Sequence, residues 1–280
     1  MIPTSEYLTL LGREMHYTQW GRDNAETIVM WHGLARTGRD FDDIAGLLSR
    51  RYRVVCPDTI GRGLSQWSPR PDTEYCLAYY AQTAAALCDA LDIGQMHWLG
   101  TSMGGAIGMV LAGREGLLAG RMRSLVLNDI GPVIAPAALE RIRRYAGNPA
   151  AFEKVSELET YFRTIYAPFG ELSDSQWRRL TEASMRRLPD GRVTPHYDPE
   201  MVRQFVNYPN DYDLWPIYDG IDVPVLCLRG ANSDLLLAET AEEMTRRGPR
   251  CALVTVPGAG HAPALNVPGQ IELIESFFAR

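Results

Sequence analysis

The chain has 280 residues, of which 46% are hydrophobic and 22% are charged, so it is long enough to bury the core of one large α/β domain with an insertion. Its formal net charge of −6 gives no electrostatic reason to expect a nucleic acid or an anionic membrane surface as a partner. No stretch approaches the ~18 apolar residues of a spanning helix, and the N-terminus lacks a basic region followed by an apolar run. We therefore expect a cytoplasmic protein without membrane association.

Strands and helices alternate along the first half of the chain. Residues 28–31, 53–56 and 96–99 are short apolar runs that are typical of buried strands. Residues 41–48 and 77–91 carry apolar side chains at helical spacing. This alternation predicts a mostly parallel central sheet with helices on both faces.

The strand signal disappears between residues 132 and 215. This segment is predicted to form helices at residues 137–145, 153–166 and 173–188. Ser173 and Gln176 match a capping box at the start of the last helix, and Asp190-Gly191 matches a helix stop. The predicted organisation is a core formed by residues 1–131 and 216–280, with a helical cap insertion at residues 132–215.

The five cysteines are spread along the chain without the spacing of metal-binding motifs. Several of them lie in apolar, strand-like runs, where free cysteine behaves as a small hydrophobic residue. The sequence therefore predicts neither a disulfide framework nor a metal site.

A serine between two glycines follows the apolar run at residues 96–99. Gly100, Ser102 and Gly104 form a G-x-S-x-G pattern, and an apolar helix at residues 105–112 follows directly. In this strand–turn–helix setting the serine sits on a sharp turn that holds its hydroxyl clear of the sheet. The helix N-terminus also places backbone N–H groups where negative charge develops in acyl transfer. Ser102 is therefore the candidate nucleophile.

A serine nucleophile needs a histidine base, which is held in turn by an acid. Of the five histidines, His261 lies in a glycine-rich loop after an apolar run at residues 251–256. Asp234 follows another apolar run, at residues 223–228. The resulting chain order of serine, aspartate and histidine is the order found when a G-x-S-x-G serine sits on a strand-to-helix turn.

Together these features resemble the α/β-hydrolase superfamily over nearly the whole chain. Residues 30–34 resemble the family's H-G motif, and residues 58–65 resemble its D-x-x-G-x-G-x-S turn. The serine turn, the acid loop and the histidine loop follow in the family's order. The resemblance implies the α/β-hydrolase fold with a cap, an oxyanion hole formed by the backbone N–H groups of Leu34 and Met103, and no metal or cofactor.

A second acidic residue competes for the role of the acid. Asp129 ends the apolar run at residues 124–128, a position where some α/β-hydrolases carry the acid of the triad. We prefer Asp234 because its Arg-Gly-x-x-Ser-Asp context resembles the usual acid loop. Asp129 also precedes Ile130-Gly131-Pro132, which resembles a hinge into the cap. Asp129 is kept as the alternative.

The other histidines and one further aspartate are assigned mainly structural roles. His32 is expected to brace the oxyanion loop, and Asp58 is expected to shape its own turn through hydrogen bonds to the backbone. His16 and His97 are expected at the surface. His196 lies in the cap and is a candidate contact for the substrate.

The sequence therefore predicts a serine hydrolase that cleaves a small carboxylic ester or lactone through an acyl-enzyme. Most aromatic side chains of the cap are expected to pack in its core, and a few to line an apolar pocket over Ser102. One alternative is a C–C bond hydrolase of the meta-cleavage type. Those enzymes usually have motifs similar to G-N-S-M-G-G and G-H-W, and here Thr101 and Ala262 stand in the places of the asparagine and the tryptophan. Another alternative is a slow or non-catalytic receptor for a small ligand on the same fold.

Overall fold

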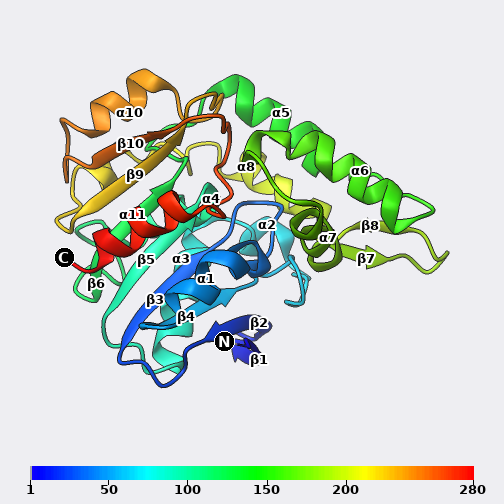
Figure 1. The fold of residues 1–280 in the computed structure, drawn as a ribbon, viewed down its shortest axis with the longest axis horizontal. Helices are drawn as coiled ribbons and strands as arrows, with labels where there is room; N and C mark the ends of the chain where they lie inside the picture. The colour runs from blue at the N-terminus through cyan, green and yellow to red at the C-terminus, as the bar shows by residue number, and fades with distance from the viewer. Residues whose placement is uncertain (1) are drawn as a thin grey trace.

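A computed structural model describes residues 2–280, which form one eight-stranded sheet with helices on both faces (Figure 1). The spatial order of the strands is β1-β2-β4-β3-β5-β6-β9-β10. Strand β2 pairs antiparallel with β1 and β4, and all the other neighbours are parallel, as the alternation predicts. The strands are β1 (Thr4–Leu10), β2 (Arg13–Trp20), β3 (Glu26–Trp31), β4 (Tyr52–Pro57), β5 (Met96–Thr101), β6 (Met122–Asn128), β9 (Val225–Gly230) and β10 (Ala252–Val256).

Side chains of the central strands alternate between two apolar cores, one on each face of the sheet. In β3, Ile28 and Met30 belong to one core while Val29 and Trp31 belong to the other, as the two-residue period of a strand requires. Because both faces are covered, these strands are apolar at nearly every position. The first core is covered by α1 (Asp42–Leu48) and α11 (Pro268–Phe278), and the second by α3 (Leu77–Ala90), α4 (Met103–Ala112) and α10 (Ala238–Met244). The 3₁₀ helix η1 (Gly38–Phe41) leads into α1, and the short helix α2 (Pro71–Glu74) precedes α3.

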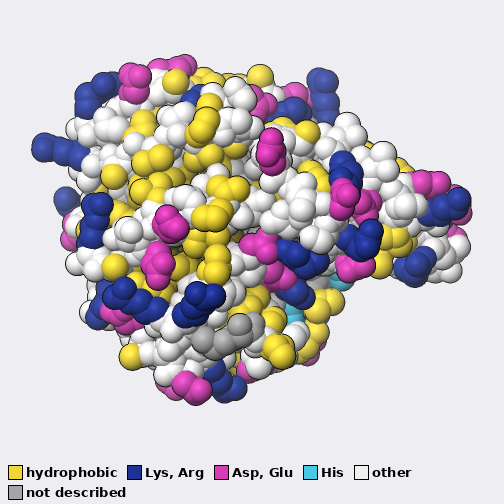
Figure 2. Space-filling view, in the orientation of Figure 1, with side chains coloured by type: hydrophobic (Ala, Val, Ile, Leu, Met, Phe, Trp, Pro, Cys, Tyr) yellow, Lys and Arg dark blue, Asp and Glu magenta, His cyan; other side chains and the backbone are white. Residues whose placement is uncertain are grey.

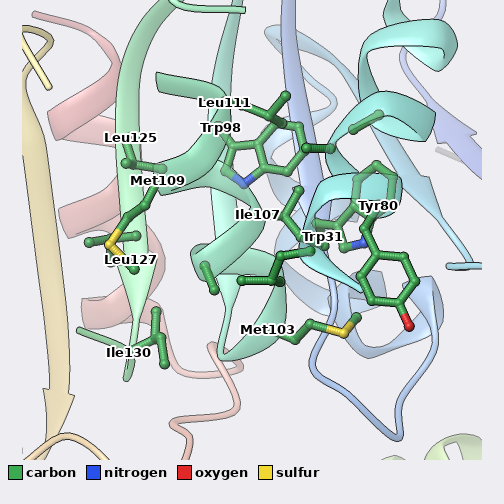
Figure 3. Close-up of a cluster of buried hydrophobic side chains, with 14 of the residues drawn as sticks. Trp31, Tyr80, Trp98, Met103, Ile107, Met109, Leu111, Leu125, Leu127 and Ile130 are labelled. Atoms are coloured by element: carbon green, nitrogen blue, oxygen red, sulfur yellow. The ribbon is translucent and has the colours of Figure 1, made fainter. Parts of the chain in front are cut away.

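Helix α4 packs closely on the sheet through its glycines. Figure 3 shows Trp98 lying between α4 and the neighbouring strands, near Leu111 and Trp31. The rings of Trp31 and Trp98 stack with centroids 5.4 Å apart. A β-carbon on Gly108 would lie 2.6 Å from the Trp98 indole, so no larger residue fits there without displacing that ring.

The cap segment, residues 132–215, contains helices and also a short pair of strands. Its elements are α5 (Pro136–Ala146), α6 (Val155–Ile165), η2 (Ala167–Phe169), α7 (Asp174–Ala183), β7 (Met185–Arg187), β8 (Val193–Pro195), η3 (Pro199–Arg203) and α8 (Gln204–Asn207), and α9 (Trp215–Tyr218) follows at its end. The first two predicted helices are confirmed, and so is the capping box of Ser173 and Gln176.

The prediction of a helix over residues 173–188 is wrong beyond Ala183. Strands β7 and β8 pair antiparallel, and Val193 also bridges Phe152 on the other side, so tertiary pairing overrides the helical spacing. The sequence Asp190-Gly191 forms the turn of this hairpin instead of stopping a helix. Gly191 has φ = 90°, a conformation that glycine adopts without strain.

The cap segment packs partly on itself and partly on the second core, which α3, α4 and α10 cover; this second core is the main core of the molecule. Helices α6 and α7 and strand β8 share a small apolar cluster of their own, whose buried members are Leu158, Phe162, Tyr166, Trp177 and Val193. Helix α5 instead buries Ala138, Ile142 and Ala146 in the main core. The cap elements lie together to one side of the sheet in Figure 1.

The surface carries charges of both signs. Figure 2 shows Lys and Arg side chains interspersed with Asp and Glu over the face in view.

All five cysteines are buried and free. Within residues 2–280, none of the helices has both the length and the apolar character required to cross a membrane.

The packing of α4 predicts opposite outcomes for two glycine-to-alanine substitutions. Gly108→Ala places a methyl group 2.6 Å from the Trp98 ring, and we expect it to lower the free energy of unfolding by about 1–3 kcal/mol. Gly46→Ala lies within α1, where an added β-carbon meets nothing within 4 Å. It should raise the free energy of unfolding by about 0.5–1 kcal/mol, because alanine favours the helix. Urea unfolding of both variants gives the comparison, and equal losses would contradict the packing argument.

Candidate active site

Ser102 lies on a sharp turn between β5 and α4. Its backbone has φ = 52° and ψ = −118°, a strained conformation for a residue with a side chain. The turn requires the flanking glycines, since a β-carbon on Gly100 would lie 2.2 Å from the Gly104 carbonyl oxygen, and one on Gly104 would lie 1.9 Å from the Trp31 carbonyl oxygen. The turn therefore places Ser102 at the N-terminus of α4 with its hydroxyl directed away from the strand.

Ser102, His261 and Asp129 form one chain of hydrogen bonds. The Ser102 hydroxyl lies 2.9 Å from His261 Nε2, and His261 Nδ1 lies 2.7 Å from Asp129 Oδ2. Asp129 is fully buried and also accepts hydrogen bonds from the Gly230 N–H and the Ser233 hydroxyl, at 2.7 and 2.6 Å. Because the carboxylate only accepts, Nδ1 carries the proton and Nε2 accepts from the serine hydroxyl.

The prediction that Asp234 holds His261 is wrong, and Asp129, the alternative acid, makes that contact instead. The carboxylate of Asp234 is 54% exposed and forms a two-point ion pair with Arg141 of α5, at 3.0 and 2.9 Å. The physical reason is the order of the strands. Asp129 directly follows β6, which neighbours β5 and Ser102, whereas β9 is one strand farther away and its loop directs Ser233 inward and Asp234 outward.

Two backbone N–H groups beside Ser102 are candidates for binding an oxyanion. Leu34 lies in the loop after β3, and Met103 is the first residue of α4. A β-carbon on Gly33 would lie 3.6 Å from Ser102 Cβ, which places the Leu34 loop against the serine. Within residues 2–280, neither N–H donates to a backbone or side-chain acceptor.

His32 braces this loop, as expected from the sequence. Its Nδ1 donates to the Gly33 carbonyl at 2.7 Å, and its Nε2 accepts from the Thr59 N–H at 2.9 Å. Burial lowers the pKa of His32 to about 4, although the nearby charge of Asp58 raises it. The ring is therefore neutral at neutral pH, which its acceptor role at Nε2 requires.

Asp58 holds its turn together and has a histidine partner that the sequence analysis placed at the surface. It accepts from the Gly38 and Leu64 N–H groups and lies 2.8 Å from His16 Nδ1. Burial raises the pKa of Asp58, but the hydrogen bonds from His16 and the Leu64 N–H, together with the electrostatic effect of His16 and His32, outweigh it and leave that pKa below its ordinary value. His16 is buried because β2 pairs with β4 and brings it to the end of that strand.

The environments of His97 and His196 differ from those that the sequence indicated. His97 is buried against Ser124, to which its Nδ1 is hydrogen-bonded at 2.8 Å, and is not at the surface. The backbone of His196 bonds to Gly63 and Ser184, and this residue lies outside the cavity over Ser102.

A cavity of about 950 Å³ lies between Ser102 and the cap. Its core-side residues include Leu34, Arg36, Thr101, Ser102, Asn232 and His261, and its cap-side residues include Ile142, Tyr145, Ile165, Tyr166 and Phe169. A few cap aromatics were expected to line the pocket, and Tyr166 and Phe169 do so, while Phe162 and Trp177 pack in the cap core. The sequence analysis missed Tyr145 and Arg36, because neither belongs to a motif. In residues 2–280 there is no group of three or more His, Cys, Asp or Glu side chains arranged to hold a metal ion.

A model of the alpha/beta hydrolase family matches residues 28–271. The chain belongs to the α/β-hydrolase family. The resemblance noted from the motifs, the fold expected from it and the general activity of a hydrolase are thereby confirmed.

Individual members of the α/β-hydrolase family match nearly the full length. The chain is 42% identical over 274 residues to the 3-hydroxybutyrate-oligomer hydrolase of Cupriavidus necator, covering 94% of this chain and 92% of that protein. It is 28% identical over 235 residues to the 2-(acetamidomethylene)succinate hydrolase of Mesorhizobium japonicum, covering 84% and 81%. The crystal structure of an alpha/beta hydrolase from Novosphingobium aromaticivorans is similar with a TM-score of 0.88 and 33% identity, covering 99% and 98% of the two chains.

The burial of neutral His32 predicts a loss of stability in mild acid. The pKa of His32 is about 4 in the folded protein, against 6.5 for an unperturbed histidine. The unfolded chain therefore binds the proton first as the pH falls, and the stabilisation present above pH 6.5 declines toward pH 4. From pH 8 to pH 5 we expect His32 to account for a loss of about 2 kcal/mol in the free energy of unfolding.

Urea unfolding at several pH values tests this expectation. The variant His32→Asn should show a smaller decline between pH 8 and pH 5 than the unmodified protein. Part of the decline should remain, since burial also lowers the pKa values of His97 and His196. An undiminished pH dependence in the variant would show that His32 is not the group responsible.

Proposed function

We propose that this chain is a serine esterase that hydrolyses short oligomers of a 3-hydroxy acid such as 3-hydroxybutyrate. The observation that carries the reaction type is the chain of hydrogen bonds from Ser102 through His261 to Asp129 at the base of the cavity. The substrate class is supported by the 42% identity to a 3-hydroxybutyrate-oligomer hydrolase over 94% of the chain. Such oligomers are ester-linked, so this serine chemistry suits them.

In the proposed acylation step, the Ser102 oxygen attacks the ester carbonyl while His261 Nε2 takes the hydroxyl proton. The carbonyl oxygen becomes an oxyanion, which the N–H groups of Leu34 and Met103 bind. Loss of one such donor in another serine hydrolase costs about 3–4 kcal/mol of transition-state stabilisation. The intermediate then collapses, the C–O bond breaks, and His261 returns the proton to the departing alcohol.

In the proposed deacylation step, His261 removes a proton from water, which attacks the acyl-serine ester. The second tetrahedral intermediate collapses and releases the acid, and the proton returns to Ser102. Throughout, Asp129 holds the proton on Nδ1 and stabilises the imidazolium that forms in each step. The Gly230 N–H and the Ser233 hydroxyl also donate to this carboxylate and hold it in the orientation that faces His261.

Residues 132–215 are proposed to act as a cap that limits the size of the substrate. The residues of α5, α6 and η2 that face Ser102 form much of the cavity wall, and the cavity volume of about 950 Å³ suits a small molecule. Each methylene in such a pocket changes binding by only about 1–3 kcal/mol, so selectivity among acyl groups should be graded.

Other reactions of this family use the same residues. A lactone would be opened by the same steps, with the alcohol remaining attached to the acyl group. The C–C hydrolase alternative gains no support from the site, since Thr101 and Ala262 depart from that pattern. The short contact of 2.9 Å between Ser102 and His261 favours an enzyme over a non-catalytic receptor.

The proposal predicts that the purified protein releases 3-hydroxybutyrate from its linear dimer and trimer, which chromatography of the products measures. Ser102→Ala should lower this rate by at least ~10³-fold, since the nucleophile is lost. A fluorophosphonate probe should label the unmodified protein and not the variant, with unchanged circular dichroism as the folding control. Labelling that persists in Ser102→Ala, or no release from any oligomer, would overturn the proposal.

The identity of the acid is tested by two matched aspartate-to-asparagine variants. Asp129→Asn should lower kcat on an activated ester by roughly 10⁴-fold, because the amide no longer holds the tautomer in which Nε2 accepts. Asp234→Asn removes only a solvent-exposed ion pair with Arg141 and should change kcat by less than about threefold. Reversed effects would mean that the loops rearrange so that Asp234 holds His261 during catalysis.

A further inference from the structure

Arg36 lies beside the nucleophile at the inner end of the cavity. A β-carbon on Gly33 would lie 3.6 Å from Ser102 Cβ and 3.8 Å from Arg36 Cγ. The side chains of Ser102 and Arg36 therefore both begin next to Gly33. Arg36 is 5% exposed and lines the cavity that contains Ser102. A buried arginine whose side chain begins next to the nucleophile and lines the same cavity has a position suited to bind part of the substrate.

The guanidinium of Arg36 is held in a fixed orientation. Its Nε and Nη2 donate to the two carboxylate oxygens of Asp40 at 2.8 and 2.5 Å. Its Cζ lies 4.6 Å from the centre of the Tyr166 ring and 5.9 Å from that of Phe169, so cap aromatics cover it. A planar group fixed along one edge and over one face loses little further freedom when it binds a ligand.

The remaining nitrogen, Nη1, is buried and has no hydrogen-bond partner within residues 2–280. A buried cationic donor without a partner is unfavourable, so such an atom in a ligand cavity points to a ligand acceptor. The other arginines of the cavity differ, since Arg141 and Arg144 have side chains that are 48% and 79% exposed and pair with Asp234 and Glu140. Water weakens what these two can contribute.

We propose that Arg36 Nη1 binds the free carboxylate of the 3-hydroxy acid unit that leaves, so that the enzyme prefers oligomers with a free acid end. This inference rests on the proposed function. In the acid-terminal unit only the C2 and C3 carbons separate the carboxylate from the ester oxygen. An arginine beside Ser102 is therefore placed to reach this carboxylate when the terminal ester is cleaved.

The charge of the substrate favours this assignment over an uncharged acceptor. Bringing a carboxylate into a largely apolar cavity requires a cationic donor close to it. Arg36 is buried, so its attraction is screened less than that of the arginines at the mouth. The preferred cleavage is thus at the acid-terminal ester, and monomers leave one at a time from that end.

The test compares two substrates that differ only in this group, the linear 3-hydroxybutyrate dimer and its methyl ester. The unmodified enzyme should show a kcat/KM about ten- to hundredfold higher for the acid, the range expected for a hydrogen bond to a charged group. Arg36→Gln should abolish most of this ratio. Arg39→Gln is the matched control, because Arg39 lies three residues further on in η1, pairs with Asp42 and has a side chain that is 42% exposed, and it should leave the ratio intact.

A second measurement separates binding from a structural role. Free 3-hydroxybutyrate should inhibit hydrolysis of p-nitrophenyl acetate competitively, and its inhibition constant should rise about tenfold or more in Arg36→Gln but not in Arg39→Gln. If Arg36→Gln does not fold, Arg36→Lys keeps the charge beside Asp40 but not the planar fork of donors, and it should reduce the preference without abolishing it.

The outcomes distinguish this inference from the proposed function. If the unmodified enzyme cleaves neither dimer, the proposed function fails. If it cleaves both equally well, or if Arg36→Gln lowers both rates by the same factor, only the role of Arg36 is overturned. If the preference survives in Arg36→Gln and disappears in Arg144→Gln, the carboxylate is bound at the mouth and the inference is wrong.

Discussion

The buried carboxylate of Asp129 is the group on which the arrangement of the site depends. A charge removed from water is tolerated only when its oxygens are satisfied, and here they accept from Gly230, Ser233 and His261. Gly230 is the last residue of β9, Ser233 and His261 lie in the loops after β9 and β10, and Asp129 directly follows β6. One carboxylate therefore ties three strand ends together and sets the position of the histidine relative to Ser102.

The parallel sheet explains why these residues meet. Strands β3, β5 and β6 are neighbours, and their carboxyl ends lie at the same edge, where ligands bind in open α/β sheets. The loops after these strands carry Leu34, Ser102 and Asp129 in that order, so adjacent strands supply the proposed oxyanion donor, nucleophile and acid. His261 reaches them from the loop after β10, at the outer side of the sheet.

The sequence analysis correctly predicted features that depend on local pattern, and it failed where spatial neighbours decide. The serine turn and the parallel strands follow from glycine positions and apolar runs, which are local. Asp129 and Asp234 both follow apolar strands, and only the order of β6 and β9 in the sheet distinguishes them. Asp190-Gly191 is typical both of a helix stop and of a hairpin turn, and the pairing of Val193 with Phe152, some forty residues away, supports the hairpin of β7 and β8.

Water screens the charged groups at the two ends of the cavity to different extents. At the mouth, the pair of Arg141 and Asp234 is about half exposed, and such pairs contribute only about 0–1 kcal/mol. It therefore cannot be what holds α5 over the site, and the burial of Ala138, Ile142 and Ala146 in the main core does so instead. At the inner end, the Arg36 side chain is 6% exposed and lies against Tyr166 and Phe169, so water screens its charge less than it screens the pair at the mouth. Under the proposed function, discrimination between charged and neutral substrates is therefore assigned to the inner end of the cavity, and apolar packing of the cap is proposed to limit how large a substrate can enter.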